Sequence, residues 1–129
     1  MASTQLGKVQ LRIMQVLWDR GRATAREITD AINASEPIAH STVQTLLRGL
    51  EEKRSVSHET QDRTFVFFPL VKEHEFKQSA TRDLVERVFG GSVGNLVAHL
   101  LKNESVSREE IDEIRQLINK RTQKGGETP

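Results

Sequence analysis

The sequence predicts a mainly α-helical protein with one small β-hairpin. Six segments place apolar residues three and four positions apart, the spacing that gives a helix one buried face. Between the third and fourth of these segments, two short runs are instead rich in the β-branched and aromatic residues of strands. With 129 residues, the chain has the length of one domain or of two small ones.

The first three predicted helices occupy the N-terminal part of the chain. The first extends from Leu6 to Arg20 and ends at Gly21. The second begins at the capping box Thr24–Glu27, in which a hydroxyl and a carboxylate can bond the free amides of a helix start. Residues 33–37 form a turn, because proline lacks an amide hydrogen and restricts the residue before it. The third helix then extends from His40 or Ser41 to Lys53.

A hairpin is predicted after the third helix. Two β-prone runs, Val56–Glu59 and Thr64–Phe68, flank the polar turn Thr60–Arg63, and Pro69 ends the second strand. Three helices followed by a hairpin is the element order of a winged helix-turn-helix. In that fold the third helix enters the major groove of DNA and the hairpin, or wing, flanks the backbone.

Three more helices are predicted beyond the hairpin. They cover 72–89, stopped by Gly90 and Gly91, then 93–102, and a segment that begins at the capping box Ser107–Glu110. Three such helices are too few to bury their apolar stripes, so we expect a second copy of the chain to cover them. The expected dimer interface contains Leu84, Val88, Leu96, Leu100, Ile114, Leu117 and Ile118.

The predicted organisation is therefore a winged helix-turn-helix plus a C-terminal helical dimerisation region. The DNA-binding domain is expected over residues 1–71 and the dimerisation domain over 72–121. Residues 122–129 are polar, contain two glycines and are expected to be a disordered tail.

Composition excludes several classes of function. The chain has no cysteine, which removes disulfides, thiolate metal sites and cysteine nucleophiles. No apolar run approaches the roughly 18 residues of a membrane-spanning helix. The first five residues also lack the apolar stretch of a signal peptide, so we expect a cytoplasmic protein with no direct membrane binding. The net charge of +1 gives no general attraction to nucleic acid, so DNA binding must depend on where particular side chains lie.

The third predicted helix has a polar face opposite its apolar one. At about 100° per residue, its Val and Leu side chains fall on one side, while hydroxyl, amide and guanidinium groups fall on the other. These polar groups bind base edges and phosphates, but they also occur on helices that only face solvent. The candidate DNA contacts are Ser41, Thr42, Gln44, Thr45 and Arg48. At the hairpin tip, Arg63 is either a phosphate or minor-groove contact or a solvated turn residue.

The aromatic residues of the hairpin allow two interpretations. Phe65 and Phe67 share one face of the second strand, and Phe68 lies on the other face. Such rings can form a platform on which single-stranded bases stack, or they can pack into the core beneath the wing. We expect core packing for at least one of the two faces.

No arrangement of residues predicts an enzyme, a cofactor or a metal site. The sequence has no phosphate-binding loop and no nucleophile motif. His40, His58, His74 and His99 fall in different elements, without the spacing of a metal-binding pair. A small hydrolase that uses Glu73 and His74 is one alternative function. A protein-interaction adaptor, in which the winged helix has no DNA affinity, is the other.

Several stretches together resemble the penicillinase repressor family, the BlaI/MecI/CopY type. The likeness covers nearly the whole chain from Leu6 to Lys120 and is carried by Val16–Trp18, Ser41–Lys53, Val56–Glu59, Arg63–Val71, Phe89–Gly91 and Glu110–Asn119. The resemblance implies a homodimeric repressor that binds inverted-repeat operators and silences genes for β-lactam resistance or copper export. By position, it also implies that the recognition helix is Ser41–Arg54.

Three departures from the family pattern bear on mechanism. Arg54 stands where the family commonly has glycine, so the turn after the recognition helix is expected to differ. The absence of cysteine excludes the cysteine motif of the copper-responsive members. In the β-lactam repressors, a sensor protease cuts an Asn-Phe bond in the dimerisation region. The matching positions here are His99 and Leu100, which differ from that pair, so a membrane-bound sensor protease would either recognise a different sequence at this candidate bond or cut elsewhere.

Overall fold

The computed structural model describes residues 6–125 of the chain. Contacts between residues divide it into two compact units, the first ending at Leu84 and the second beginning at Val85. The boundary lies inside helix α4 (Glu73–Val88), which belongs to both units. The functional division expected after residue 71 stays a prediction.

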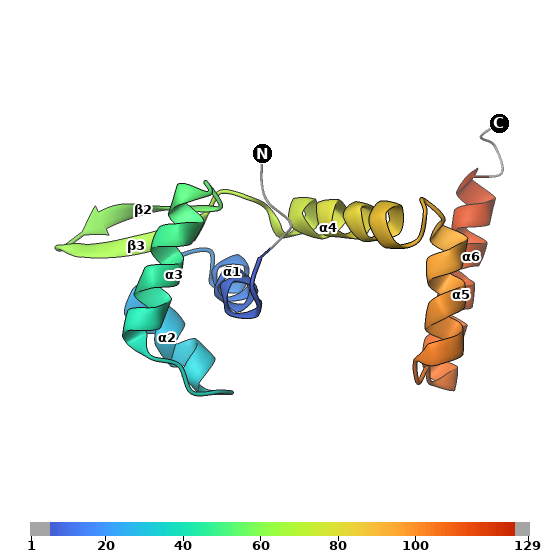
Figure 1. Cartoon of the computed structure of the whole chain (residues 1–129), viewed down its shortest axis with the longest axis horizontal. Helices are drawn as coiled ribbons and strands as arrows, with labels where there is room; N and C mark the ends of the chain where they lie inside the picture. The colour runs from blue at the N-terminus through green and yellow to red at the C-terminus, as the bar shows by residue number, and fades with distance from the viewer. Residues whose placement is uncertain (1–5, 126–129) are drawn as a thin grey trace. The chain divides into compact units, whose positions relative to one another are not determined.

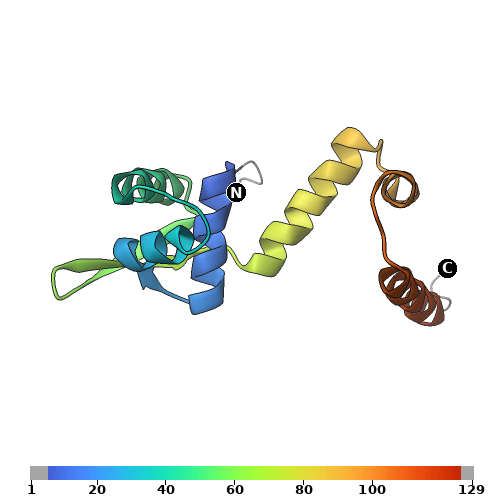
Figure 2. The same ribbon diagram turned by 90° about the horizontal axis from the view of Figure 1, so that it is seen from below.

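The first unit contains three helices and a three-stranded antiparallel sheet (Figure 1). Figure 2 shows the hairpin of β2 and β3 extending beyond the helices of this unit. Its elements, in chain order, are α1 (Lys8–Arg20), β1 (Ala23–Thr24), α2 (Ala25–Asn33), α3 (His40–Glu52), β2 (Val56–Gln61), β3 (Thr64–Pro69) and the first part of α4. The predicted order of helices and hairpin is confirmed, although α1 begins two residues later than expected.

One apolar core holds the first unit together. Each of the helices α1, α2 and α3 contributes the apolar face that its spacing predicts, and the sheet closes the core from one side. Fully burying a side chain of this size contributes about 1.5–3 kcal/mol, so the core dominates the stability of the unit. The buried cluster consists of Ile13, Met14, Leu17, Ala23, Ile28, Ile32, Val43, Leu47, Leu50, Val56 and Phe67.

The sheet has a strand that the sequence did not reveal. Strand β1 pairs with β3, with Ala23 opposite Phe67 and Thr24 opposite Val66, so the strand order is β1-β3-β2. Two residues are too few to show an alternating pattern. The same Thr24 also caps α2, because its side chain accepts a hydrogen bond from the Glu27 amide and the Glu27 carboxylate accepts one from the Thr24 amide. The predicted capping box is confirmed.

The hairpin turn is shorter than predicted. The strands pair as far as Gln61 opposite Thr64, which leaves a loop of two residues instead of the expected 60–63. Asp62 and Arg63 have φ angles of 50° and 66°. Two consecutive residues in the left-handed region are the requirement of a type I′ turn, which matches the twist of the two strands. Residues 60 and 61 are therefore strand rather than turn.

Beyond α4, the second unit contains α5 (Val93–Asn103) and α6 (Arg108–Gly125). The hydroxyls of Ser92 and Ser107 cap these helices, each accepting a hydrogen bond from the amide three residues later. The expected tail begins too early, because α6 continues through residues 122–125. There the Thr122 hydroxyl donates to the carbonyl of Ile118 at 2.9 Å. The rest of the expected tail, 126–129, lies outside the described residues. Within residues 6–125, no helix combines the length and apolar character needed to cross a membrane.

Candidate nucleic-acid interface

Helix α3 presents the polar face that the sequence predicts. Its apolar side is in the core, with Val43, Leu47 and Leu50 at most 1% exposed. The opposite side is exposed, and it carries all five candidate contacts of this helix: Ser41, Thr42, Gln44, Thr45 and Arg48. The structure therefore places these five side chains where a ligand outside the core can reach them.

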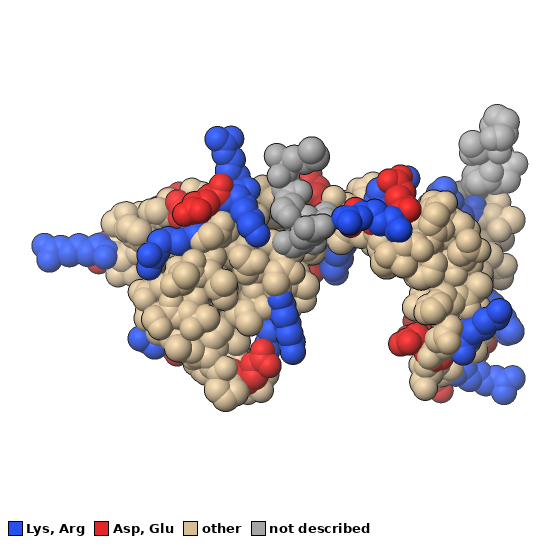
Figure 3. All heavy atoms as spheres, in the orientation of Figure 1, with Lys and Arg blue, Asp and Glu red and all other residues tan. Residues whose placement is uncertain are grey.

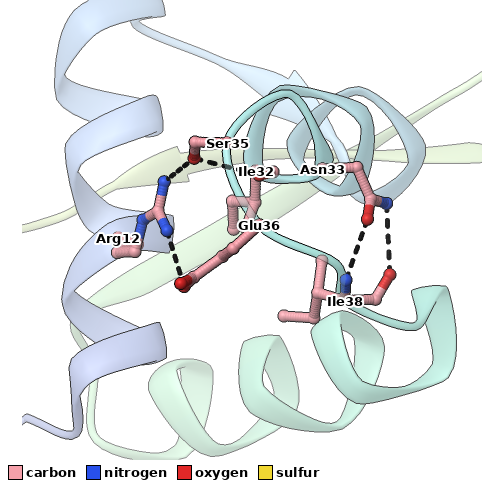
Figure 4. Close-up of polar contacts among 6 residues, drawn as sticks. All are labelled: Arg12, Ile32, Asn33, Ser35, Glu36 and Ile38. Atoms are coloured by element: carbon pink, nitrogen blue, oxygen red, sulfur yellow. Dashed lines mark hydrogen bonds and ion pairs between the residues drawn. The ribbon is translucent and has the colours of Figure 1, made fainter.

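The turn between α2 and α3 is held by side chains rather than by its own backbone alone (Figure 4). The Asn33 amide donates to the Ile38 carbonyl at 3.1 Å, and its oxygen accepts from the Ile38 amide at 2.8 Å. From α1, Arg12 forms an ion pair with Glu36 at 2.6 Å and donates to the Ser35 hydroxyl. These contacts fix the path of the chain into α3.

The first residue of α3 is also tied to α2. The buried Thr29 hydroxyl lies 2.7 Å from the Ala25 carbonyl and 3.0 Å from Nδ1 of His40. A hydroxyl has one hydrogen, and the Ala25 carbonyl can only accept, so Thr29 donates to Ala25 and accepts from His40. Nδ1 of His40 is therefore the donor in this contact, which anchors the start of α3.

A surface groove of about 840 Å³ lies between α3, the wing and the start of α2. It brings together three of the predicted DNA contacts, Gln44 and Arg48 from α3 and Arg63 from the wing. Ser41, Thr42 and Thr45 lie on the exposed face of α3 but do not line the groove. The other lining residues are Thr24, Ala25, Arg26, His40, Glu51, Glu52, His58, Thr64, Phe65 and Phe67.

An aromatic cluster forms the wing side of this groove. The rings of His58 and Phe65 are stacked, with centroids 4.0 Å apart and planes 19° apart. Phe67 meets Phe65 edge-on at 6.3 Å. Phe67 is 7% exposed and belongs to the core, whereas Phe65 is 50% exposed. The expected core packing is therefore found for Phe67, while the outer part of Phe65 faces the groove.

Two carboxylates near the groove contact a nitrogen atom of another side chain. Oε1 of Glu51 accepts a hydrogen bond from Nδ1 of His58 at 2.8 Å, which ties α3 to β2. On the wing, Glu59 pairs with Arg22 at 2.7 Å. The guanidinium of Arg22 offsets the negative charge that Glu59 would direct at a nucleic acid. Figure 3 shows Lys and Arg side chains interspersed with Asp and Glu on the face in view, in agreement with the near-neutral net charge.

The end of α3 is closed by Arg54 in a left-handed conformation, with φ 63°. The Arg54 amide donates to the Glu51 carbonyl at 3.0 Å, and the Ser55 amide donates to the Leu50 carbonyl at 2.9 Å. This pair of bonds is the Schellman motif, which most often has glycine at the left-handed position. The turn thus has the geometry that glycine favours, although this sequence has arginine there.

Sequence reasoning missed several residues that line the groove. Arg26 lies inside the capping box Thr24–Glu27, a pattern that predicts the start of a helix and no role for the Arg26 guanidinium in the groove. His58 lies on the same face of the hairpin as Phe65, an expected candidate for base stacking, and the strand register could have revealed that shared face. Their proximity to α3 follows from tertiary packing, for which the sequence carries no local signal.

The alternative hydrolase site is not assembled. Glu73 and His74 are exposed at the start of α4, and Glu73 pairs with Lys77 at 3.1 Å. In the described part of the chain, no three His, Asp or Glu side chains are grouped to hold a metal ion. These observations do not support a hydrolase site at Glu73 and His74.

The expected dimer residues are largely exposed within their own units. In the first unit, Leu84 is 42% exposed. In the second unit, Val88, Leu100, Leu117 and Ile118 are between 42% and 66% exposed, while Leu96 and Ile114 are partly buried. Val93, Val97 and Leu101 are further exposed apolar residues, outside the expected interface. Only Val85 is buried among the described apolar residues of the second unit.

The two residues of the candidate cleavage bond are exposed on α5. The ring of His99 lies 5.7 Å from the ring of Phe89, and the side-chain amide of Asn103 donates to the His99 carbonyl at 3.0 Å. Leu100 is 42% exposed. The bond itself is inside a helix.

Comparisons with known proteins cover both units. The methicillin resistance regulatory protein MecI of Staphylococcus aureus (strain N315) is 24% identical over 91% of this chain and 95% of its own length. A penicillinase repressor of Bacillus licheniformis is 25% identical over 88% of this chain and 89% of its own.

Solved structures share the fold. The solution structure of the DNA-binding domain of the repressor BlaI matches with a TM-score of 0.51 and 25% identity, covering 58% of this chain and 93% of that one. A mutant MarR from E. coli complexed with operator DNA matches with a TM-score of 0.54 at 10% identity, covering 90% of this chain and 75% of that one. The first unit is thus a winged helix-turn-helix. The family model for the penicillinase repressor matches residues 6–120, and the chain belongs to that family.

Proposed function

We propose that the chain is a homodimeric transcriptional repressor that binds double-stranded, inverted-repeat operator DNA. The observation that carries the proposal is the polar face of α3, whose Gln44 and Arg48 share one groove with Arg63 of the wing. Glutamine can bond adenine with two hydrogen bonds, and arginine can bond guanine in the same way. Membership of a repressor family and the likeness to the BlaI DNA-binding domain support the same function.

The proposed dimer forms through the C-terminal helices. Large apolar side chains remain exposed on α5 and α6, and exposed patches of this kind mark protein interfaces. A dimer of identical subunits has twofold symmetry, which matches the symmetry of an inverted repeat. The second subunit then binds its half-site at a high effective concentration once the first is bound.

Repression would end when the dimer is cut. In this proposal, a membrane-bound sensor protease cleaves the second unit at His99-Leu100, both of which are exposed. The test is intact-mass analysis of the chain recovered from its host cells before and after exposure to a β-lactam. A fragment that begins at Leu100 is the expected product. Full-length chain alone, in cells that have been induced, would contradict this step.

The central test is binding to DNA from the upstream region of the protein's own gene. We expect a gel shift with a fragment that contains an inverted repeat, and a loss of at least tenfold in affinity for Arg48→Ala. Arg20→Ala is the matched control, because it removes the same charge from an exposed position on α1 that does not line the groove. No shift with any upstream fragment at low salt would favour the alternative, a protein-interaction adaptor without DNA affinity.

A further inference from the structure

The surface groove beside α3 contains one exposed aromatic ring among its polar side chains. In the described part of the first unit, the large apolar residues that are exposed are Phe65, Leu70 and Leu84, and of these only Phe65 lines the groove. Phe65 is 50% exposed, whereas Phe67 beside it is 7% exposed. Phe65 therefore leaves apolar surface in contact with water, and a ligand that covers this surface gains free energy.

Neighbouring side chains fix the position of this ring. His58 covers one face of Phe65, with the two centroids 4.0 Å apart, and Phe67 meets Phe65 edge-on at 6.3 Å. Nδ1 of His58 in turn donates to Oε1 of Glu51 at 2.8 Å, which attaches the stack to α3. A ring that is already held in place loses little conformational entropy on binding, so its exposed part can contribute to affinity.

The same ring is close to the groups that bind bases in the proposed function. Gln44 and Arg48 line the groove together with Phe65. The guanidinium groups of Arg26, Arg48 and Arg63 also line it, and none of them has an ion-pair partner among the described residues. The second helix of a helix-turn-helix lies in the major groove of DNA. The surface groove next to α3 then places Phe65 at the edge of that major groove.

Thymine is the base whose chemistry fits an apolar ring at this position. Of the four bases, only thymine presents a C5-methyl group in the major groove, where the other base groups are hydrogen-bond donors and acceptors. Contact between an apolar side chain such as phenylalanine and this methyl group is one way in which proteins read DNA sequence directly. Stacking on a base would instead require an unpaired base, and His58 already covers one face of Phe65.

We propose that Phe65 is a specificity-determining residue that contacts the C5-methyl group of one thymine in each operator half-site. The proposal rests on the proposed function, because it requires α3 in the major groove of duplex DNA. It adds an apolar contact from the wing to the hydrogen bonds expected from Gln44 and Arg48. Two elements, α3 and β3, would then read one half-site, and the bond between His58 and Glu51 would keep them in register.

The experiment removes the methyl group from the DNA and the ring from the protein, separately and together. Deoxyuridine, which lacks only the C5-methyl group, replaces thymine at one position at a time in both half-sites of an inverted repeat that the full-length wild type binds. At one position we expect about fourfold weaker binding for each methyl group lost, and at least tenfold for the two half-sites together. Phe65→Ala should bind the thymine operator at least tenfold more weakly and should distinguish thymine from deoxyuridine at that position by less than twofold.

Leu70→Ala is the matched control, because Leu70 is 51% exposed in the same unit and does not line the groove. It should keep the wild-type affinity and the full preference for thymine. Phe65→Leu keeps an apolar side chain and should retain a preference of at least threefold. Phe65 lies outside the buried cluster of the first unit, so we expect both Phe65 variants to fold, which circular dichroism checks.

Two outcomes would overturn the thymine contact while the repressor function stands. One is that the wild type shows no methyl dependence at any thymine. The other is that Phe65→Ala keeps the wild-type dependence, even with weaker binding overall, because the ring would then contact the sugar-phosphate backbone. If the wild type binds no DNA, the proposed function fails first.

Discussion

Arg54 has a left-handed backbone conformation, which is higher in free energy for a residue with a Cβ atom than for glycine. A left-handed residue other than glycine carries about 1–2 kcal/mol of strain. Glycine also raises the conformational entropy of the unfolded chain. This lowers the free energy of unfolding by about 0.4–1 kcal/mol and offsets part of the stability gained by relieving the strain. We therefore expect Arg54→Gly to raise the free energy of unfolding by about 0.5–1 kcal/mol, measured by urea denaturation. A decrease would mean that the Arg54 side chain makes a stabilising contact that outweighs the strain.

Gln44 and Arg48 should determine base preference rather than general affinity. Both are exposed on α3 and line the groove. Replacing either with alanine should remove about 1–3 kcal/mol of discrimination at particular operator positions, because each side chain can form two hydrogen bonds to one base. Competition binding against a set of single-base operator variants measures this. If both variants keep the wild-type preference at every position, α3 does not read bases through these residues.

At the scale of elements, the Asn33 side chain adds hydrogen bonds to those that the backbone makes in the turn between α2 and α3. Its side chain makes two hydrogen bonds to Ile38, and each such bond contributes about 0.5–1.5 kcal/mol. We expect Asn33→Ala to lower the free energy of unfolding by about 1–2 kcal/mol and to weaken DNA binding, because the start of α3 loses its support. Thermal unfolding and DNA titration test the two effects.

A graded variant sharpens that test. Asn33→Asp keeps an oxygen that can accept from the Ile38 amide but loses the donor to the Ile38 carbonyl, so its stability should lie between wild type and Asn33→Ala. Asn119→Ala, at an exposed position on α6, is the control for loss of an asparagine. Equal stability of Asn33→Ala and wild type would show that the turn is held without this side chain.

The elements that the sequence predicted are those with a periodic or capping signal. The apolar stripe of α3 and the capping box at Thr24 each depend on residues close together in the chain, so local patterns were enough to find them. Strand β1 depends on pairing with β3, more than 40 positions later, and two residues carry no period of their own. The polar face of α3 was visible for the same local reason.

The remaining part of the candidate interface is tertiary. The stack of His58 on Phe65 follows from strand register, and the bond from His58 to Glu51 follows from packing of α3 on β2. Pairing of the two hairpin strands accounts for the shared face of His58 and Phe65, but no local pattern predicts the packing of α3 on β2. The contact between the Trp18 and Phe76 rings is also tertiary, because it joins two helices that are separated in sequence by the rest of the winged domain.

At the scale of the whole molecule, the exposed apolar residues of the second unit predict that the chain functions as a dimer. Leu117 is 65% exposed on α6. Leu117→Glu places a charge in the proposed interface, where it would be desolvated and without a partner. We expect sedimentation equilibrium to show monomers, with unchanged affinity for a half-site and at least tenfold weaker binding to the full operator.

Gln116→Glu is the matched control for that prediction. It adds the same charge at the neighbouring exposed position of α6, which is not among the expected interface residues. It should remain a dimer with wild-type operator affinity. If Leu117→Glu also remains a dimer, the interface lies elsewhere on the chain.

The buried cluster of the first unit has a consequence for how the protein is made. Its last member in chain order is Phe67, so every buried residue of that core has been synthesised when nearly half of the chain is still to come. Domains generally fold as units, and the N-terminal one folds first during translation. The DNA-reading unit can therefore fold on the ribosome before any helix needed for pairing has emerged. Subunits would then meet as chains whose reading faces are already complete.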